Sequence, residues 1–303
     1  MDRSLQAWAP EPVVCQRTLK APIGCVGVGL HSGQRVRLTF RPAPANHGIV
    51  FRRTDLGADI PATADRVVDT RLCTVLAEGS ARVGTVEHVM AALAGCGIDN
   101  ALVELDAPEP PVLDGSAAQF VFLLDCAGVV AQDTPRRTIE ICRTVRVSEG
   151  GAFAEFRPGA DGLDMAMSID FAAVAIGRQA LSLRLSPESF RQELARARTF
   201  TLVEEIDELR AAGLAQGGSL DNAVVVDQAR VLNPTGLRAP DEFVRHKLLD
   251  AVGDLALAGA PLRGRFVAHR SGHTLNNRLL RALFADRRAW REIVPAELSI
   301  AAE

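Results

Sequence analysis

The sequence contains Ala92-Leu93-Ala94-Gly95 and, in its second half, Ala256-Leu257-Ala258-Gly259. Each copy ends an apolar pattern with helical spacing, and a glycine at that place is a common helix stop. A β-rich run follows each copy, at 101–105 and at 265–269. The same order of helix and strand therefore occurs twice along the chain.

The order continues beyond these strands. Asp114-Gly115-Ser116 opens a predicted helix at 117–124, and Ser271-Gly272-His273 opens another at 275–284. Internal self-similarity of this kind fixes an architecture before any single element does. Chance similarity between two α+β stretches is the alternative, because each shared motif is short.

A second shared pattern precedes the helices in each half. Phe-Arg-Pro occurs at 40–42 and at 156–158, and turn residues follow each copy. The next β-rich runs are 49–51 in the first half and 163–171 in the second. Turn residues between two β-rich runs predict a hairpin in both places.

We therefore predict an α+β protein made of two similar two-layer α/β sandwich domains that arose by internal duplication. The domains would span 16–131 and 138–294, with the polar stretch 132–137 between them. Residues 1–15 would form a disordered extension and 295–303 a tail. The active site is expected between the halves, where concave clefts form.

Charge and composition argue against a nucleic-acid-binding module. The formal net charge at pH 7 is −3 and aromatic residues make up 5%, whereas such a module presents a basic face with interleaved aromatic side chains. No run reaches the ~18 consecutive apolar residues of a membrane span. Residues 1–14 lack the apolar core of a signal peptide, so we expect a cytoplasmic protein.

Glu87 and His88 are expected in the first turn of a helix. Thr85 is a favourable N-cap residue, and Gly95 is the stop. Neighbouring side chains on a helix point about 100° apart, so one could bind a metal while the other addresses a water. The alternative is ordinary helix-dipole chemistry, which accounts for most acidic residues at helix starts.

The segment 241–254 predicts a helix that carries His246 and Asp250 on one face. Their i,i+4 spacing places them one turn apart, and Asp254 continues the row. An imidazole and a carboxylate so placed can share one divalent ion. A surface His–Asp pair is the alternative. The apolar residues of the segment indicate a buried helix, where unpaired acids are costly.

His273 follows a predicted strand and lies at the start of the last helix. A histidine there can act in acid–base chemistry, although a plain capping loop explains the segment equally well by itself. The three segments are more informative together than singly. Two imidazoles and one carboxylate leave an open position for water, which is typical of a hydrolytic zinc site, and Glu87 and His273 remain as the proton carriers that amide cleavage needs.

Several of these segments also resemble a known enzyme family. The matching motifs are Gly-Val-Gly-Leu-His-Ser-Gly (27–33), Thr-Val-Glu-His (85–88), Ala-Arg-Thr-Phe (197–200), Asp-Glu-Phe-Val-Arg-His-Lys-Leu-Leu-Asp (241–250) and Ser-Gly-His-Thr-Leu-Asn-Asn (271–277). They resemble the UDP-3-O-acyl-N-acetylglucosamine deacetylases of Gram-negative bacteria, which catalyse the committed step of lipid A synthesis. The resemblance extends over about residues 16–283.

The resemblance implies a zinc-dependent amide hydrolase with two α+β sandwich domains and a small insert in each. The second insert would span about 200–225 and form an apolar passage for the acyl chain of the substrate. Candidate lining residues are Leu202, Ile206, Ala223 and Val225. Hydrophobic core is an equally good explanation for each of the four.

The resemblance also implies a role for each site residue. The zinc ligands would be His88, His246 and Asp250. Glu87 would be the general base that activates the attacking water. His273, protonated and held by Asp254, would stabilise the oxyanion or protonate the departing amine.

Further residues are assigned to substrate in the same way. Thr199 would donate a hydrogen bond to the tetrahedral intermediate, Phe200 would contact the sugar, and Lys247 would bind a substrate oxygen. Cys73 resembles a cysteine near the zinc in some relatives, and a buried spectator thiol is the alternative.

Other functions remain open from the sequence. A hydrolase of another amide or ester could share the metal site and differ in its pocket. Two histidines and one carboxylate suit ferrous iron as well as zinc. A non-catalytic relative would lack a ligand or the base, and none is missing. We expect a monomer with a small-molecule substrate, no nucleic-acid partner and at most peripheral contact with a membrane.

Overall fold

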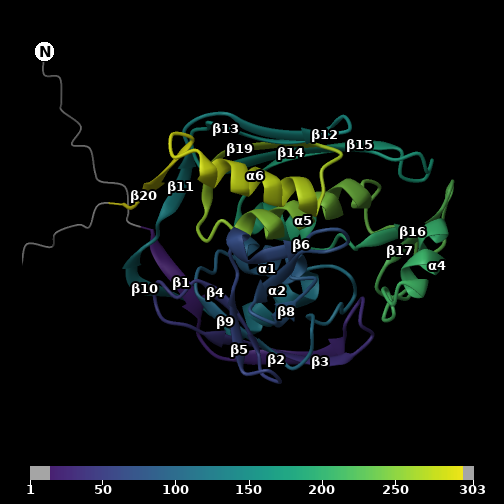
Figure 1. Ribbon diagram of the computed structural model, residues 1–303, viewed down its shortest axis with the longest axis horizontal. Helices are drawn as coiled ribbons and strands as arrows, with labels where there is room; N and C mark the ends of the chain where they lie inside the picture. Colours follow the sequence, from purple (N-terminus) through teal and green to yellow (C-terminus); the bar gives the residue numbers. More distant parts are fainter. Residues whose placement is uncertain (1–13, 296–303) are drawn as a thin grey trace, which may run out of the picture.

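The computed structural model describes residues 14–295 (Figure 1). They form an α+β fold in which two large sheets lie on the outside and the main helices lie between them. Most of the predicted extension and tail falls outside the described residues. Cys15, which we placed in the extension, instead begins the strand β1 (Cys15–Leu19).

The first sheet has five strands, and their alternating residues face the helices. Val36, Leu38 and Phe40 of β3 are all buried, whereas the residues between them are more exposed. Only β4 and β9 pair in parallel, and the other pairs are antiparallel. In spatial order the strands are β2 (Ile23–Val28), β3 (Arg35–Pro42), β9 (Ala101–Leu105), β4 (Ile49–Arg53) and β5 (Ala58–Pro61).

The second sheet repeats this order and these directions. Its one parallel pair within the repeated part joins β14 and β19, at the place where the first sheet joins β4 and β9. The corresponding strands are β12 (Val145–Glu149), β13 (Ala152–Arg157), β19 (Leu262–His269), β14 (Leu163–Asp170) and β15 (Arg178–Leu185). The common topology is what a duplication predicts, and the duplication itself stays a prediction.

The two predicted hairpins are wrong in their pairing. The strands themselves are present, but β9 lies between β3 and β4, so that Val103 is the register partner of both Phe40 and Phe51. In the second sheet β19 separates β13 from β14 in the same way, and Phe266 takes the place of Val103. The turn residues specify a change of direction, and they do not specify that the flanking strands are neighbours.

The helices come together in the middle of the molecule (Figure 1). They are α1 (Glu87–Gly95), α2 (Ala118–Ala127), α5 (Glu242–Ala256) and α6 (His273–Ala285). α2 packs against β2, α5 against β14 and β15, and α6 against β12 and β13. α1 and α5 pack on each other across the two halves of the chain. A Cβ atom on Gly253 of α5 would lie 2.0 Å from the carbonyl oxygen of Glu87, so only glycine allows this approach.

Each half also carries a smaller unit. In the first half it follows a short helix, η1 (Ala64–Arg66), and consists of β6 (Val67–Asp69), β7 (Val75–Glu78) and β8 (Ala81–Val83). In the second half it consists of β16 (Phe200–Leu202), α4 (Val203–Ala211), β17 (Val224–Asp227) and β18 (Arg230–Val231). The insert that we placed near 200–225 thus falls in a unit that continues to Val231.

The remaining elements join the two halves. The stretch 132–137 is not a plain linker, because β10 (Val129–Pro135) pairs with β1. β11 (Thr138–Ile141) and β20 (Trp290–Ile293) extend the second sheet, and α3 (Pro187–Ser189) with η2 (Phe190–Leu194) precedes the second insert. Among the described residues, no helix combines the length and the apolar character needed to cross a bilayer.

The close crossing of α1 and α5 makes a prediction about stability. Gly253→Ala should lower the free energy of unfolding by about 1–3 kcal/mol, because the added methyl group has no space against the backbone of α1. Chemical denaturation measures the change. Gly84→Ala is the control, since its Cβ would meet its nearest atoms at 3.7 Å. Equal stability of both variants would show that the two helices can separate without cost.

Candidate active site

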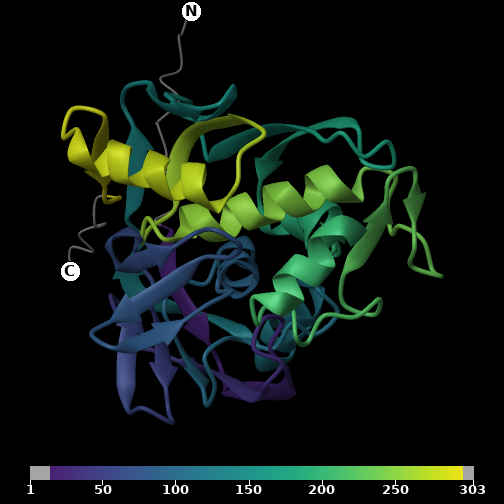
Figure 2. The ribbon, with the colours of Figure 1, turned by 45° about the vertical axis from the view of Figure 1, so that its right-hand side comes forward.

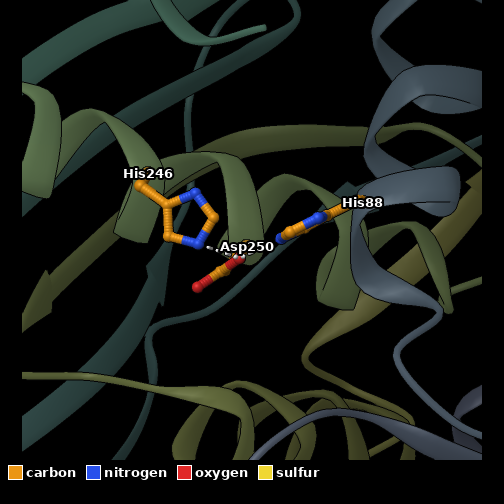
Figure 3. A group of neighbouring side chains, drawn as sticks. All are labelled: His88, His246 and Asp250. Atoms are coloured by element: carbon orange, nitrogen blue, oxygen red, sulfur yellow. Dashed lines mark ion pairs between the residues drawn. The ribbon is translucent and has the colours of Figure 1, made fainter. Parts of the chain in front are cut away.

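His88, His246 and Asp250 form a compact buried cluster between the two halves (Figure 3). His88 extends from α1, and the other two side chains extend from adjacent turns of α5. Asp250 Oδ1 lies 3.3 Å from His246 Nε2 and 3.5 Å from His88 Nε2. One ligand atom from each residue lies within 4.8 Å of the other two. The two α-helices that meet at Gly253 therefore bring the cluster together.

The cluster fits a divalent metal ion on chemical grounds. Asp250 Oδ1 is buried and has no hydrogen-bond partner, which is costly for an ionised oxygen unless a cation binds there. Burial lowers the pKa of His246 to about 4, so this imidazole is neutral at pH 7 and its lone pair is available. Two imidazoles and one carboxylate leave a position open for water.

Neighbouring groups orient these ligands. The backbone oxygen of Ala197 lies 3.1 Å from His246 Nδ1, which turns Nε2 toward Asp250. Lys247 Nζ donates to Asp250 Oδ2 at 2.9 Å and leaves Oδ1 free. Although burial opposes its charge, His246 and Lys247 hold the pKa of Asp250 well below its usual range. The carboxylate is thus ionised at neutral pH.

Asp254 is the centre of a second buried network. Its carboxylate lies 2.9 Å from His273 Nδ1 and accepts hydrogen bonds from Thr74 Oγ1 at 2.6 Å and Asn276 Nδ2 at 2.8 Å. Burial disfavours a charged His273, but the negative charges of Asp254 and Glu87 outweigh it and raise the pKa of His273 to about 9. His273 therefore carries a proton at neutral pH.

Glu87 completes the group of titratable side chains. Its Oε1 lies 3.8 Å from His273 Nε2, and its Oε2 accepts a hydrogen bond from the backbone of Thr74 at 3.0 Å. Burial raises the pKa of Glu87, which brings a carboxylate closer to the range of a useful proton acceptor. Cys73 precedes Thr74, and burial with the nearby charge of Glu87 raises the pKa of its thiol to about 12. The Cys73 thiol is therefore protonated.

The predicted N-cap role of Thr85 is wrong. Thr85 has a φ of +51°, and the residue at the helix boundary is Val86, which makes no side-chain cap. The Thr85 hydroxyl donates instead to Glu109 at 2.9 Å. An N-cap residue has an extended backbone and lies at the helix boundary, so the left-handed backbone of Thr85 and its place one residue before that boundary both exclude the role.

A cavity of about 540 Å³ opens beside the cluster. It contains the metal-ligand candidates together with Glu87, His273 and Lys247. The structure brings all the predicted substrate residues to the same cavity: Thr199, Phe200, Leu202, Ile206, Ala223 and Val225. Phe200 packs edge-on against His246, with ring centroids 6.1 Å apart. Asp254 is absent from the cavity wall and acts through His273.

Sequence reasoning missed three residues of this region. Thr74 bridges Glu87 and Asp254, Asn276 also binds Asp254, and Glu109 binds Thr85. Asn276 belongs to the Ser-Gly-His motif, so its position was a usable signal. Thr74 and Glu109 lie in connecting segments between strands and helices, where a single sequence offers no periodic pattern.

Comparisons with known proteins agree with the motifs. A family model described as UDP-3-O-acyl N-acetylglycosamine deacetylase matches residues 16–285. The UDP-3-O-acyl-N-acetylglucosamine deacetylase of Acidithiobacillus ferrooxidans is 50% identical over 289 residues, which cover 94% of this chain and 95% of the relative. Proteins of the same name from Actinobacillus pleuropneumoniae and Stenotrophomonas maltophilia are each 49% identical, over 283 and 282 residues; the matches cover 92% of this chain and 92% and 93% of the relatives.

These matches, with the buried cluster, define the class of protein as an amidohydrolase of a metal-dependent family. Within that class, the chain belongs to the UDP-3-O-acyl-N-acetylglucosamine deacetylase family. The resemblance stated from the motifs is confirmed.

The Asp254–His273 contact makes a prediction about protonation. Asp254→Asn should lower the pKa of His273 from its value of about 9, because the substitution removes the negative charge that most favours the protonated imidazole. NMR titration of the imidazole in chelator-treated protein measures it. Asp164→Asn, which removes a surface carboxylate paired with Arg184, is the control. An unchanged His273 titration in Asp254→Asn would contradict the assignment.

The same contact predicts how stability depends on pH. The pKa of His273 is higher in the folded chain than its ordinary value of 6.5, so its stabilisation is fully present below pH 6.5 and is lost as pH rises through about 9. The shift is about 2.5 pKa units, so at about 1.4 kcal/mol per unit at most about 3.5 kcal/mol depends on this group. Denaturation of chelator-treated protein from pH 6 to 10 should show a smaller decline for Asp254→Asn than for the wild type.

Proposed function

We propose that this chain hydrolyses the N-acetyl group of UDP-3-O-acyl-N-acetylglucosamine and releases acetate and the free amine, the committed step of lipid A synthesis. One observation carries the proposal. The His88–His246–Asp250 cluster, the two buried proton carriers Glu87 and His273, and a group of apolar side chains all line one cavity. We further propose zinc as the ion; iron suits the same ligands. When bound, the ion would polarise the acetyl carbonyl and lower the pKa of a water.

Glu87 is the general base in this proposal. It is buried, its burial raises the pKa of the carboxyl group, and it precedes a proposed ligand in the first turn of α1. The backbone amide of Thr74 occupies Oε2, and Oε1 remains to accept a proton from the attacking water. General-base catalysis of this kind contributes about 10²–10⁴ to the rate.

His273 is the general acid and the stabiliser of negative charge. Its pKa of about 9 keeps it protonated at neutral pH, and Asp254 fixes Nδ1 so that Nε2 faces the cavity. Nε2 can donate its proton to the departing amine. Thr199 adds a hydroxyl donor to the wall of the cavity for the oxygen of the tetrahedral intermediate.

The substrate groups follow from the wall of the cavity. Phe200 lines the cavity and would contact the sugar, and Lys247 would bind a substrate oxygen. The acyl chain would lie against the second insert. Its apolar residues in the cavity include Leu202, Ile206, Ala223 and Val225. We propose that the enzyme acts as a monomer, because one chain supplies every group named here. We also propose that it acts in the cytoplasm.

Acetate release from UDP-3-O-acyl-N-acetylglucosamine tests the proposal. The wild type should be active, and His246→Ala should lose most of its bound metal and its activity. Glu87→Ala should keep the metal and lose about 10²–10⁴ in kcat, because only the proton acceptor is removed. Metal content is measured by elemental analysis of each purified variant.

Two controls separate the alternatives. His47→Ala removes an exposed histidine outside the cavity and should leave metal content and activity unchanged. Analogues that lack the acyl chain or the nucleotide should be poor substrates. If the metal-loaded wild type cleaves such analogues or a simple ester and not the full substrate, the chain is a hydrolase with another substrate.

A further inference from the structure

Glu109 is a buried carboxylate outside the proposed chemistry, with 4% of its surface exposed. Its Oε1 accepts hydrogen bonds from the backbone amides of His31 at 3.0 Å and Ser32 at 2.6 Å, and its Oε2 accepts one from the Thr85 hydroxyl at 2.9 Å. These donors are two backbone amides and one hydroxyl. A carboxyl group buried in this way is costly unless hydrogen-bond partners satisfy its oxygens.

The amide contacts fix the turn that contains the Gly-Val-Gly-Leu-His-Ser-Gly motif. A Cβ atom on Gly29 would lie 2.4 Å from Glu109 Oε1, so glycine is required for the carboxylate to sit beneath the turn. The turn carries Leu30 and His31 on the wall of the active-site cavity. Glu109 therefore accounts for a motif that the proposed catalysis leaves unexplained.

The same turn also holds the second insert. The backbone amides of Gly217 and Gln216 donate to the carbonyl oxygens of Leu30 at 3.0 Å and His31 at 3.2 Å. Figure 2 shows the insert beside the purple N-terminal strands. One buried carboxylate is thus connected, through the turn, to the unit that forms the apolar part of the cavity.

The Thr85 contact acts on the other side of the cavity. Thr85 is β-branched and has a φ of +51°, an unfavourable conformation that its surroundings must hold in place. It lies two residues before Glu87 and three before His88. The bond from its hydroxyl to Glu109 therefore sets where α1 begins and how its first turn faces the cluster.

We propose that Glu109 is a positioning residue, which fixes the first turn of α1 through Thr85 and the 29–33 turn through the amides of His31 and Ser32. The kinetic part rests on the function proposed above. Glu109 touches no reacting atom. It holds the general base, one metal-ligand candidate and the insert in one relative arrangement, and a displacement of about 1 Å at such a site can cost about 10² in rate.

Two pairs of variants of the metal-loaded enzyme test the proposal. Glu109→Leu and Thr85→Val each remove the Thr85–Glu109 bond and should lower kcat by about 10²-fold with KM and metal content little changed. Glu109→Gln keeps an acceptor for the amides and can donate to Thr85 Oγ1, and Thr85→Ser keeps the hydroxyl. Both conservative variants should retain most of kcat. The double variant should lose no more than Glu109→Leu alone, because both changes break the same bond.

Hydrogen exchange measures the positioning without substrate. In Glu109→Leu the amides of His31 and Ser32 should exchange about tenfold faster or more, and that of Met90, which bonds Val86 in the first turn of α1, should also exchange faster. In Thr85→Val, of these three amides, only that of Met90 should exchange faster. Melting curves show whether Glu109→Leu folds. If it does not fold, the comparison of Thr85→Val with Thr85→Ser tests the proposal.

The outcomes separate the two proposals. If the wild type releases acetate and folded Glu109→Leu and Thr85→Val keep their kcat, Glu109 is not a positioning residue. The same follows if their activity falls only in proportion to lost metal, or if the conservative variants lose as much. If the wild type is inactive and the exchange changes appear as expected, the positioning stands and the proposed substrate is wrong.

Discussion

The contact between α1 and α5 is the constraint on which the site depends. α1 belongs to the first half of the chain and α5 to the second, and they cross where Gly253 meets the backbone of Glu87. A larger residue would push the helices apart. His88 would then move away from His246 and Asp250, whose own spacing is fixed by one helical turn. The three metal-ligand candidates therefore come together only when the two halves are folded and packed on each other.

The buried charges around this contact follow a consistent electrostatic design. In the described part of the chain, Glu87, Asp250 and Asp254 are three buried acids, and Lys247 and a protonated His273 supply positive charge beside them. With all three acids ionised, one negative charge remains. This negative charge is least balanced at Asp250 Oδ1, which has no hydrogen-bond partner. A divalent cation would correct this imbalance, which agrees with the chemistry of the ligand atoms.

Much of the fold and the site could be predicted because short, local patterns encode them. The i,i+4 spacing of His246 and Asp250 depends only on helix geometry, and the strand at 101–105 is found where the pattern placed it. The pairing of β3 with β9, in place of β4, could not be predicted. Pairing is set by which apolar faces meet in three dimensions. Judged from the sequence alone, a sheet with β3 next to β4 and a sheet with β9 between them would bury Phe40 and Phe51 equally well.

The residues that sequence reasoning missed share a physical reason. Thr74 and Glu109 act through hydrogen bonds from irregular segments, to partners more than ten positions away along the chain. Thr85 was assigned to the commonest role of its residue type. A left-handed backbone and a buried carboxylate elsewhere changed that role. Such outcomes depend on backbone conformations and hydrogen-bond partners that only the assembled fold brings together.

Backbone contacts across the two halves make the cavity a preformed one. The amide of Thr199 donates to the carbonyl oxygen of Gly115 at 2.8 Å, and a Cβ on Gly115 would lie 1.9 Å from the carbonyl oxygen of Asn222. On the other side of the insert, a Cβ on Gly217 would lie 2.2 Å from the carbonyl oxygen of Gly29. The insert is thus held to the first half at two places where glycine permits direct backbone approach. Because these backbone approaches leave no space for the insert to move toward the first half, we expect its apolar wall to keep a fixed distance from Glu87 and His273, and in the function proposed above that distance would limit which substrates fit.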